Sequence, residues 1–142
     1  MKIQDIQQEI IDEFAMFDAE DWDERYQYLI DLGKTLPLIA PQYKTDDNLI
    51  KGCQSRVWLH AEARDGRIYF TADSDAILTK GIIAILIRTF SGQSAKDILE
   101  ADTQFLDQIG LREHLSPTRA NGLVSMVKQI KMYALAFETK NA

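Results

Sequence analysis

The spacing of apolar residues predicts an amphipathic helix at the start of the chain. Ile3, Ile6, Ile10, Phe14 and Phe17 recur every three or four positions, with glutamine and acidic residues between them. This period places the apolar side chains on one stripe of a helix. The stripe can then pack against a core.

A second helix is expected to begin near Asp18 and Asp21, where acidic side chains suit the positive end of the helix dipole. Gly33 offers a stop at its carboxyl end. Residues 34–48 are predicted to be irregular, because two prolines and a run of turn-forming residues interrupt any regular pattern. The apolar positions of this helix are Trp22, Tyr26, Leu29 and Ile30.

The middle of the chain predicts a β-hairpin. Residues 56–63 and 67–72 alternate between apolar and polar side chains, and Asp65-Gly66 is a favoured two-residue turn. A three-residue loop with a bulge at Gly66 would avoid placing Arg64 opposite Arg67, but it would mix the two faces. We therefore expect the two-residue loop. Its other pairs are Ala63 with Ile68, Ala61 with Phe70, Leu59 with Ala72, Glu62 with Tyr69, and His60 with Thr71.

Helices are predicted again after the hairpin. The side chains of Asp73 and Asp75 are expected to cap an apolar helix that runs through Thr89 and ends at Gly92. Residues 94–97 resemble the start of a short helix, and Ser116-Pro117 that of a last one. Its apolar stripe is Leu123, Met126, Val127, Ile130, Ala134 and Phe137.

These elements predict an α+β fold in a single domain over residues 1–142. In this fold, a small antiparallel sheet, the hairpin around Asp65-Gly66, packs on one face against several helices. The content of 46% hydrophobic and 27% charged residues is that of an ordinary globular protein.

Charge and cysteine content narrow the function classes. The net charge of −6 argues against nucleic acid as a partner. The longest apolar run, residues 81–87, is far shorter than the ~20 residues of a membrane-spanning helix, and the amino terminus lacks a secretory pattern. The one cysteine excludes an internal disulfide and fits a reducing compartment. We expect a cytoplasmic protein that binds neither nucleic acid nor membrane.

Common catalytic patterns do not occur in the sequence. His60 and His114 are not at metal-ligand spacing with each other or with the cysteine, and no phosphate loop or nucleophile elbow is present. No metal and no cofactor are therefore expected. Composition and spacing alone point to no enzyme.

Cys53 is the one candidate for chemistry. A single cysteine is most often a small inert core residue, but polar Gln54 and Ser55 next to Cys53 favour a loop. Gly52 permits a tight or positive-φ backbone. Lys51 and Arg56 flank the segment, and nearby cations are expected to lower the thiol pKa. Because no histidine is close in sequence to act as a base, a protease-type site has no local support.

The segment GCQSRVWL, residues 52–59, closely resembles the signature of the SufE family, the sulfur-acceptor partners of cysteine desulfurases. Three further segments match that family in the same order: WDERYQYLIDLGKTLP at 22–37, ADSDAILTKG at 72–81 and LSPTRANGL at 115–123. The resemblance implies a SufE/IscU-like form of the α+β fold.

The resemblance also implies a function. A pyridoxal-phosphate-dependent cysteine desulfurase, SufS-like or CsdA-like, would pass its persulfide sulfur to Cys53 and be stimulated by this transfer. The sulfur would then go to a SufBCD-like scaffold for iron–sulfur cluster assembly. The chain itself would have little activity alone. The Gly52 hinge, next to apolar Val57 and Leu59 in the sequence, would let the loop tuck its sulfur against the domain.

Other positions in the matching segments are candidates for supporting roles. Arg119 would steer or clamp the partner or the thiolate, or is an ordinary exposed arginine of a first helical turn. Gly52, Gln54 and Ser55 would hold the loop or contact the partner, or are turn residues.

Three alternatives remain open from the sequence. The chain would be a homologous acceptor for a different desulfurase that feeds other sulfur acceptors. It would be a binding module that activates a desulfurase while Cys53 stays inert. An independent thiol enzyme is disfavoured because no resolving cysteine or local base is present.

Overall fold

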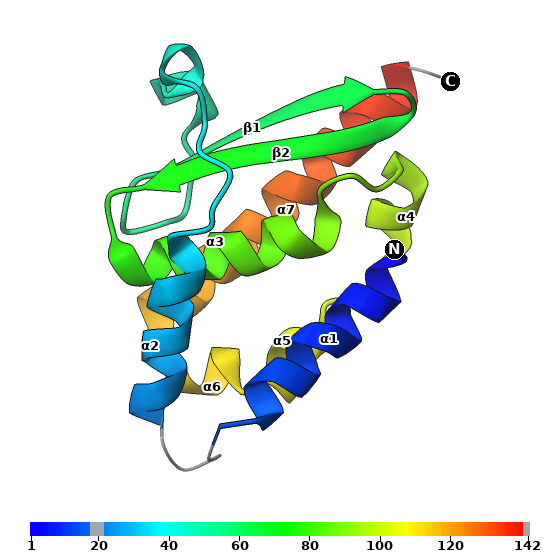
Figure 1. Cartoon of the computed structure of the whole chain (residues 1–142). Helices are drawn as coiled ribbons and strands as arrows, with labels where there is room; N and C mark the ends of the chain where they lie inside the picture. Colours follow the sequence, from blue (N-terminus) through cyan, green and yellow to red (C-terminus); the bar gives the residue numbers. More distant parts are fainter. Residues whose placement is uncertain (18–21, 141–142) are drawn as a thin grey trace.

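A β-hairpin lies across two long helices in the computed structural model, which describes residues 1–17 and 22–140 (Figure 1). The strands are β1 (Val57–Arg64) and β2 (Arg67–Ser74), and the helices are α3 (Ile77–Phe90) and α7 (Pro117–Lys140). Apolar side chains of the hairpin and of both helices form one buried cluster. The predicted α+β class, with helices on one face of a small antiparallel sheet, is confirmed.

The predicted hairpin register is confirmed at every pair. Asp65 and Gly66 both have positive φ, 52° and 77°, as a two-residue turn that matches the strand twist requires. The opposed arginines diverge. The Arg64 guanidinium lies 4.2 Å from the centre of the Tyr69 ring, and Arg67 Nη1 donates to the Gly92 carbonyl at 2.8 Å. These separate partners remove the conflict that favoured a bulged loop.

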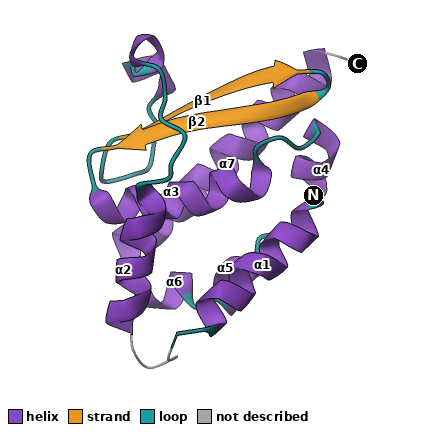
Figure 2. Ribbon diagram, in the orientation of Figure 1, coloured by secondary structure: helices purple, strands orange, loops and turns teal. Residues whose placement is uncertain are grey.

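The remaining α-helices lie on the side of α3 and α7 that faces away from the sheet, and at one end of the molecule (Figure 2). Within the described ranges, none of the helices has both the length and the apolar character needed to cross a bilayer. The first predicted stripe is buried from Ile3 to Phe14, whereas Phe17 lies beyond the helix end. The expected helix start near Asp18 and Asp21 lies outside the described residues. These helices are α1 (Ile3–Ala15), α2 (Trp22–Gly33), α4 (Ala95–Glu100), α5 (Gln104–Gln108) and α6 (Leu111–His114). Two short 3₁₀ helices, η1 (Pro41–Tyr43) and η2 (Asp46–Asn48), lie in the segment between α2 and β1, on the other side of the hairpin.

The helix starts predicted at residues 94–97 and at Ser116-Pro117 are confirmed, and a serine caps each of them. The Ser94 hydroxyl accepts from the Asp97 amide at 3.2 Å, and the Ser116 hydroxyl accepts from the Arg119 amide at 3.3 Å. The third prediction is wrong, because α3 begins after Ala76 with no side-chain cap.

The two aspartates expected at that cap bind elsewhere. β2 continues to Ser74, so Asp73 belongs to the strand, where its carboxylate pairs with Lys44 at 2.9 Å and Lys80 at 3.1 Å. Asp75 instead accepts a hydrogen bond from the Arg56 amide at 3.1 Å. The same aspartates that resembled a cap therefore tie neighbouring segments to the sheet.

The irregular segment 34–50 crosses the outer face of the hairpin (Figure 1). The Tyr43 ring stacks on His60 with the centroids 3.7 Å apart, and Lys44 Nζ lies 4.6 Å from the centre of the Trp58 ring. Ile39 and the strand residue Ala72 are joined by a backbone hydrogen bond of 3.1 Å. These contacts hold the segment on the sheet and so fix the position at which the loop of residues 51–56 begins.

Helices α2 and α3 approach closely through glycines. A Cβ built on Gly81 would lie 2.0 Å from the Leu29 carbonyl oxygen, and one on Gly33 would lie 3.0 Å from the Gly81 nitrogen. Gly33 ends α2 as predicted, and its missing side chain also allows this contact. Close approach fixes α3 in the centre of the helical layer, with its first turn beneath residues 51–56.

We predict that Gly81→Ala lowers the free energy of unfolding by about 3 kcal/mol or more, because the added methyl group meets backbone rather than a movable side chain. Urea denaturation measures this. Gly66→Ala is the matched control, since nothing lies within 4 Å of a Cβ there and only the positive φ of 77° is strained. Its expected cost is about 1 kcal/mol. Equal losses at the two positions would contradict the close α2–α3 contact.

Candidate functional site

Residues 51–56 form a closed loop between segment 34–50 and β1. At its base, the Ile50 amide donates to the Val57 carbonyl at 2.8 Å. At its exit, the Arg56 carbonyl accepts from the Ser74 hydroxyl at 2.8 Å and from the Asp75 amide at 3.3 Å. Together with the Asp75 carboxylate on the Arg56 amide, these bonds clasp the loop to the end of β2.

Gly52 shapes the loop. Its φ of 92° lies in the left-handed region that favours glycine, as the sequence suggested. A Cβ at this position would also lie 2.4 Å from the Ser125 hydroxyl oxygen of α7. The backbone conformation therefore favours glycine here, a side chain would also displace the Ser125 hydroxyl, and without one the loop can lie directly against α7.

The Cys53 side chain is turned toward α7 and half-buried. Its Sγ lies 3.6 Å from the Gly122 carbonyl oxygen, so the thiol S–H donates a weak hydrogen bond to the helix backbone. The sulfur is tucked against the domain, as expected. Val57 and Leu59, which follow the loop, are buried in the core, and the sulfur contacts α7.

A cavity of about 20 Å³ lies beside the sulfur. This volume accommodates about one water-sized atom. Side chains from the loop, from the first turns of α3 and from the start of α7 line it, and it is open to solvent on one side. The lining residues are Cys53, Gln54, Ser55, Thr79, Ile82, Thr118, Arg119, Gly122 and Met126.

Burial raises the pKa of the Cys53 thiol above its ordinary value. The prediction that Lys51 and Arg56 would lower this pKa is therefore wrong for the resting loop. Both cations are exposed, so water screens their charges, while the sulfur is turned inward away from solvent. The resting thiol is held in its protonated, less nucleophilic form.

The structure brings together most of the residues singled out in the sequence. Gln54, Ser55 and Arg119 line the same cavity as Cys53, although Gln54 and Arg119 are largely exposed. Gly52 faces Ser125 rather than the cavity.

Five cavity residues were not predicted from the sequence: Thr79, Ile82, Thr118, Gly122 and Met126. Met126 was expected in the buried stripe of α7, but not at the site. Two signals could have located Gly122: it lies in the matching segment 115–123, and a glycine inside a predicted helix weakens that helix unless another demand requires it.

Neither histidine lines the Cys53 cavity. His60 stacks on Tyr43, and His114 stacks on Trp22 with the centroids 3.9 Å apart. Both are thus packing residues at least partly open to solvent. In the part of the chain that the structure describes, no three His, Cys, Asp or Glu side chains are grouped to hold a metal ion.

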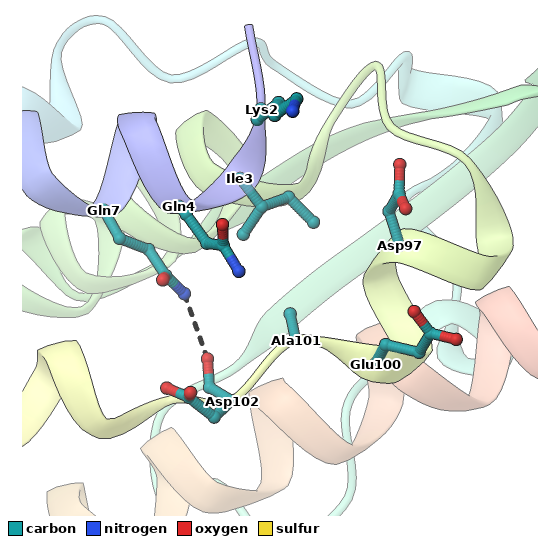
Figure 3. Close-up of a pocket in the computed structure, with 8 residues that line it drawn as sticks. All are labelled: Lys2, Ile3, Gln4, Gln7, Asp97, Glu100, Ala101 and Asp102. Carbon is teal, nitrogen blue, oxygen red and sulfur yellow. Dashed lines mark hydrogen bonds between the residues drawn. The ribbon is translucent and has the colours of Figure 1, made fainter.

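A larger cavity of about 310 Å³ lies between the start of α1 and α4 (Figure 3). Gln7 Nε2 donates across it to the Asp102 carbonyl at 3.0 Å, and three carboxylates surround it. None of its lining residues is a cysteine or a histidine, so the Cys53 cavity remains the candidate site. The larger cavity is lined by Lys2, Ile3, Gln4, Gln7, Asp97, Glu100, Ala101 and Asp102.

Comparison of the sequence with known proteins places this chain in a family. The SufE family model, described as an Fe-S metabolism associated domain, matches residues 8–134. An uncharacterized SufE-like protein of Rhizobium meliloti is 44% identical over 131 residues, which cover 89% of this chain and 92% of that protein. SufE-like protein 1, chloroplastic/mitochondrial, of Arabidopsis thaliana is 39% identical over 117 residues, which cover 82% of this chain and 32% of that protein.

A solved structure shares the fold. The solution structure of a hypothetical protein from Thermus thermophilus matches with a TM-score of 0.78, over 94% of this chain and 96% of that one. At 20% sequence identity, this likeness concerns the fold alone.

We predict that Asp75→Ala loosens the loop and speeds alkylation of Cys53 by iodoacetamide. This substitution removes the hydrogen bond from the Arg56 amide to the charged Asp75 carboxylate. Because Asp75 is exposed, the bond contributes only about 1 kcal/mol, so its loss should raise the fraction of open loop about fivefold. The exposed Asp5→Ala in α1 is the control and should leave the rate unchanged. An unchanged rate in Asp75→Ala would show that the clasp does not restrain the loop.

We also predict that the pH profile of Cys53 alkylation is shifted upward in the folded protein. Burial favours the neutral thiol, so its midpoint should lie above the ordinary pKa of 9.0 and above that of the urea-unfolded chain. The sign for stability follows: the unfolded state loses the thiol proton first, so this contribution is full below the ordinary pKa and is lost as pH rises through the folded value. A folded midpoint at or below the unfolded one would instead indicate that the flanking cations dominate.

Proposed function

This chain belongs to the SufE family, and we propose that within Fe–S metabolism it carries sulfur on Cys53. In this proposal a pyridoxal-phosphate-dependent cysteine desulfurase supplies the sulfur and is stimulated by its removal, and a scaffold for iron–sulfur cluster assembly receives it. The observation that carries the proposal is the lone thiol on a closed loop, facing a cavity with room for about one more atom.

The transfer is an exchange at sulfur. The Cys53 thiolate attacks the outer sulfur of the desulfurase persulfide, the sulfur–sulfur bond of that persulfide breaks, and its electron pair leaves on the desulfurase thiolate. A new sulfur–sulfur bond forms at Cys53, and no external oxidant or reductant is consumed. Because the attacked sulfur is already activated, the chain needs no general base of its own near Cys53.

The resting position of Cys53 suits storage rather than attack. A protonated, half-buried thiol reacts slowly, so the sulfur must leave the Gly122 carbonyl before it can enter a partner's active site. A loop can make this movement while the scaffold beneath it stays packed. In this proposal, the Gly52 backbone and the Arg56 clasp are the two points about which the loop moves.

Partner contact is assigned to the exposed residues around the cavity. The Arg119 guanidinium lies at the start of α7, on the same opening as Gln54 and Ser55, where it can meet an anionic group of the desulfurase or the departing thiolate. The proposal assigns the reaction to the single domain of residues 1–142. It also places the reaction in the cytoplasm, where a lone thiol persists in the reduced state.

We predict that mixing the protein with a cysteine desulfurase and L-cysteine adds one sulfur to its intact mass, and that a thiol reductant removes it. Cys53→Ser should show neither the gain nor the stimulation of desulfurase turnover. Trp58→Phe serves as a control that should retain both, because Trp58 does not line the cavity and its ring lies beside Lys44.

Two results would overturn the carrier proposal. No sulfur gain with a desulfurase that demonstrably binds the chain would favour a non-covalent activating module. Full stimulation by Cys53→Ser would lead to the same conclusion. Sulfur gain with one desulfurase but not with another would identify which partner the chain serves.

A further inference from the structure

Gly122 lies in the second turn of α7, where its backbone is helical and its φ is not in the left-handed region. A glycine inside a helix is less favourable than an alanine, since it loses more conformational freedom on folding. Gly122 is also buried. Neither its backbone geometry nor helix stability therefore explains a glycine at this position.

Packing in the resting state does not require the glycine either. A Cβ built on Gly122 would lie 3.5 Å from Cys53 Sγ, 3.8 Å from its Cα and 3.9 Å from its Cβ. These are ordinary van der Waals distances, so an alanine fits beside the thiol. By contrast, a Cβ at Gly52 would lie 2.4 Å from the Ser125 hydroxyl oxygen, and one at Gly81 would lie 2.0 Å from a backbone carbonyl.

The space left by the missing side chain faces Cys53. The three heavy atoms nearest to a Gly122 Cβ all belong to that cysteine. Both residues line the cavity of about 20 Å³, together with apolar Ile82 and Met126. A group added to the Cys53 sulfur therefore competes with a Gly122 side chain for one small volume.

We propose that Gly122 reserves the space for the second sulfur of a Cys53 persulfide, and so sets the size of the group that the closed loop can shelter. The inference rests on the proposed function, in which Cys53 is loaded with one sulfur. In the closed loop, the outer sulfur lies between α3 and α7 and is kept from external thiols. A larger substituent, such as a whole glutathione, does not fit and leaves the loop open.

The test loads sulfur without any desulfurase, so that it is independent of partner binding. Glutathione persulfide is the donor: the Cys53 thiolate attacks its outer sulfur, the donor sulfur–sulfur bond breaks, and glutathione thiolate leaves as the new bond forms. After removal of the donor, dithiothreitol is added. Intact mass spectrometry then follows the half-life of the added sulfur.

The expected result separates the loaded state from the resting state. Gly122→Ala should alkylate with iodoacetamide at the rate of the unsubstituted protein, because alanine fits beside the thiol. Its persulfide half-life should be shorter by about fivefold or more, because overpacking by one methyl group shifts the loaded sulfur out to solvent. The exposed neighbour Asn121→Ala is the matched control and should leave the half-life unchanged.

A second variant distinguishes loss of cavity space from a general disturbance of α7 by Gly122→Ala. Ile82→Val in the Gly122→Ala background takes away one carbon beside the cavity and should restore most of the half-life. A double variant that stays as short-lived as Gly122→Ala would overturn the proposal, since lost space would not be the cause. An unchanged half-life in Gly122→Ala would overturn it directly.

The outcome for the unsubstituted protein is also decisive. If its persulfide decays as fast as that of the urea-unfolded chain, nothing is sheltered and the proposal fails. That failure is distinct from a failure of the proposed function, which is judged by sulfur gain from a desulfurase. A protein can take sulfur from its partner and yet leave it exposed.

Discussion

Burial of α3 on nearly every side is the constraint around which the rest of the chain is arranged. Its central residues 81–87 are all buried, and the Gly81 backbone is pressed against the Leu29 carbonyl of α2. The hairpin covers another face and α7 a third. A helix that is apolar on nearly every face must be covered by other elements on nearly every side. Its first turns, with Thr79 and Ile82, then form the floor beneath Cys53.

Two kinds of attachment meet at the Cys53 loop, and they differ in strength. Ile82 and Met126 of the cavity lining belong to the apolar core, whose disruption unfolds the protein. The loop itself is held by the three bonds between Arg56 and residues 74–75 and by the weak thiol contact to Gly122. Hydrogen bonds of this kind contribute about 1 kcal/mol each, well below the roughly 5–15 kcal/mol of global stability. The loop can therefore open locally while the core stays folded.

The parts of the fold that depend on local pattern could be predicted from the sequence. The hairpin register follows from alternation and from Asp65-Gly66, and the caps at Ser94 and Ser116 follow from serine before a helix start. The cap expected from Asp73 failed because strand pairing extends β2 to Ser74, and backbone pairing outweighs a single cap. The likeness of residues 52–59 to one family located the cysteine, but not its surroundings.

The environment of Cys53 depends on contacts between residues far apart in the chain, which local charge does not reveal. Lys51 and Arg56 are neighbours in sequence yet point to water, whereas Gly122 is 69 residues away and touches the sulfur. The direction of the Cys53 pKa shift follows burial against residues that are near in space, rather than the charges that are near in sequence. Glycine at position 52 lets the loop backbone lie against α7, and Gly122 of that helix lines the cavity beside the sulfur. Burial that shields the sulfur also raises the pKa of the thiol and so lowers its reactivity. Because the loop is held weakly and the helices beneath it are packed firmly, Cys53 can be buried while the loop is closed and exposed when it opens.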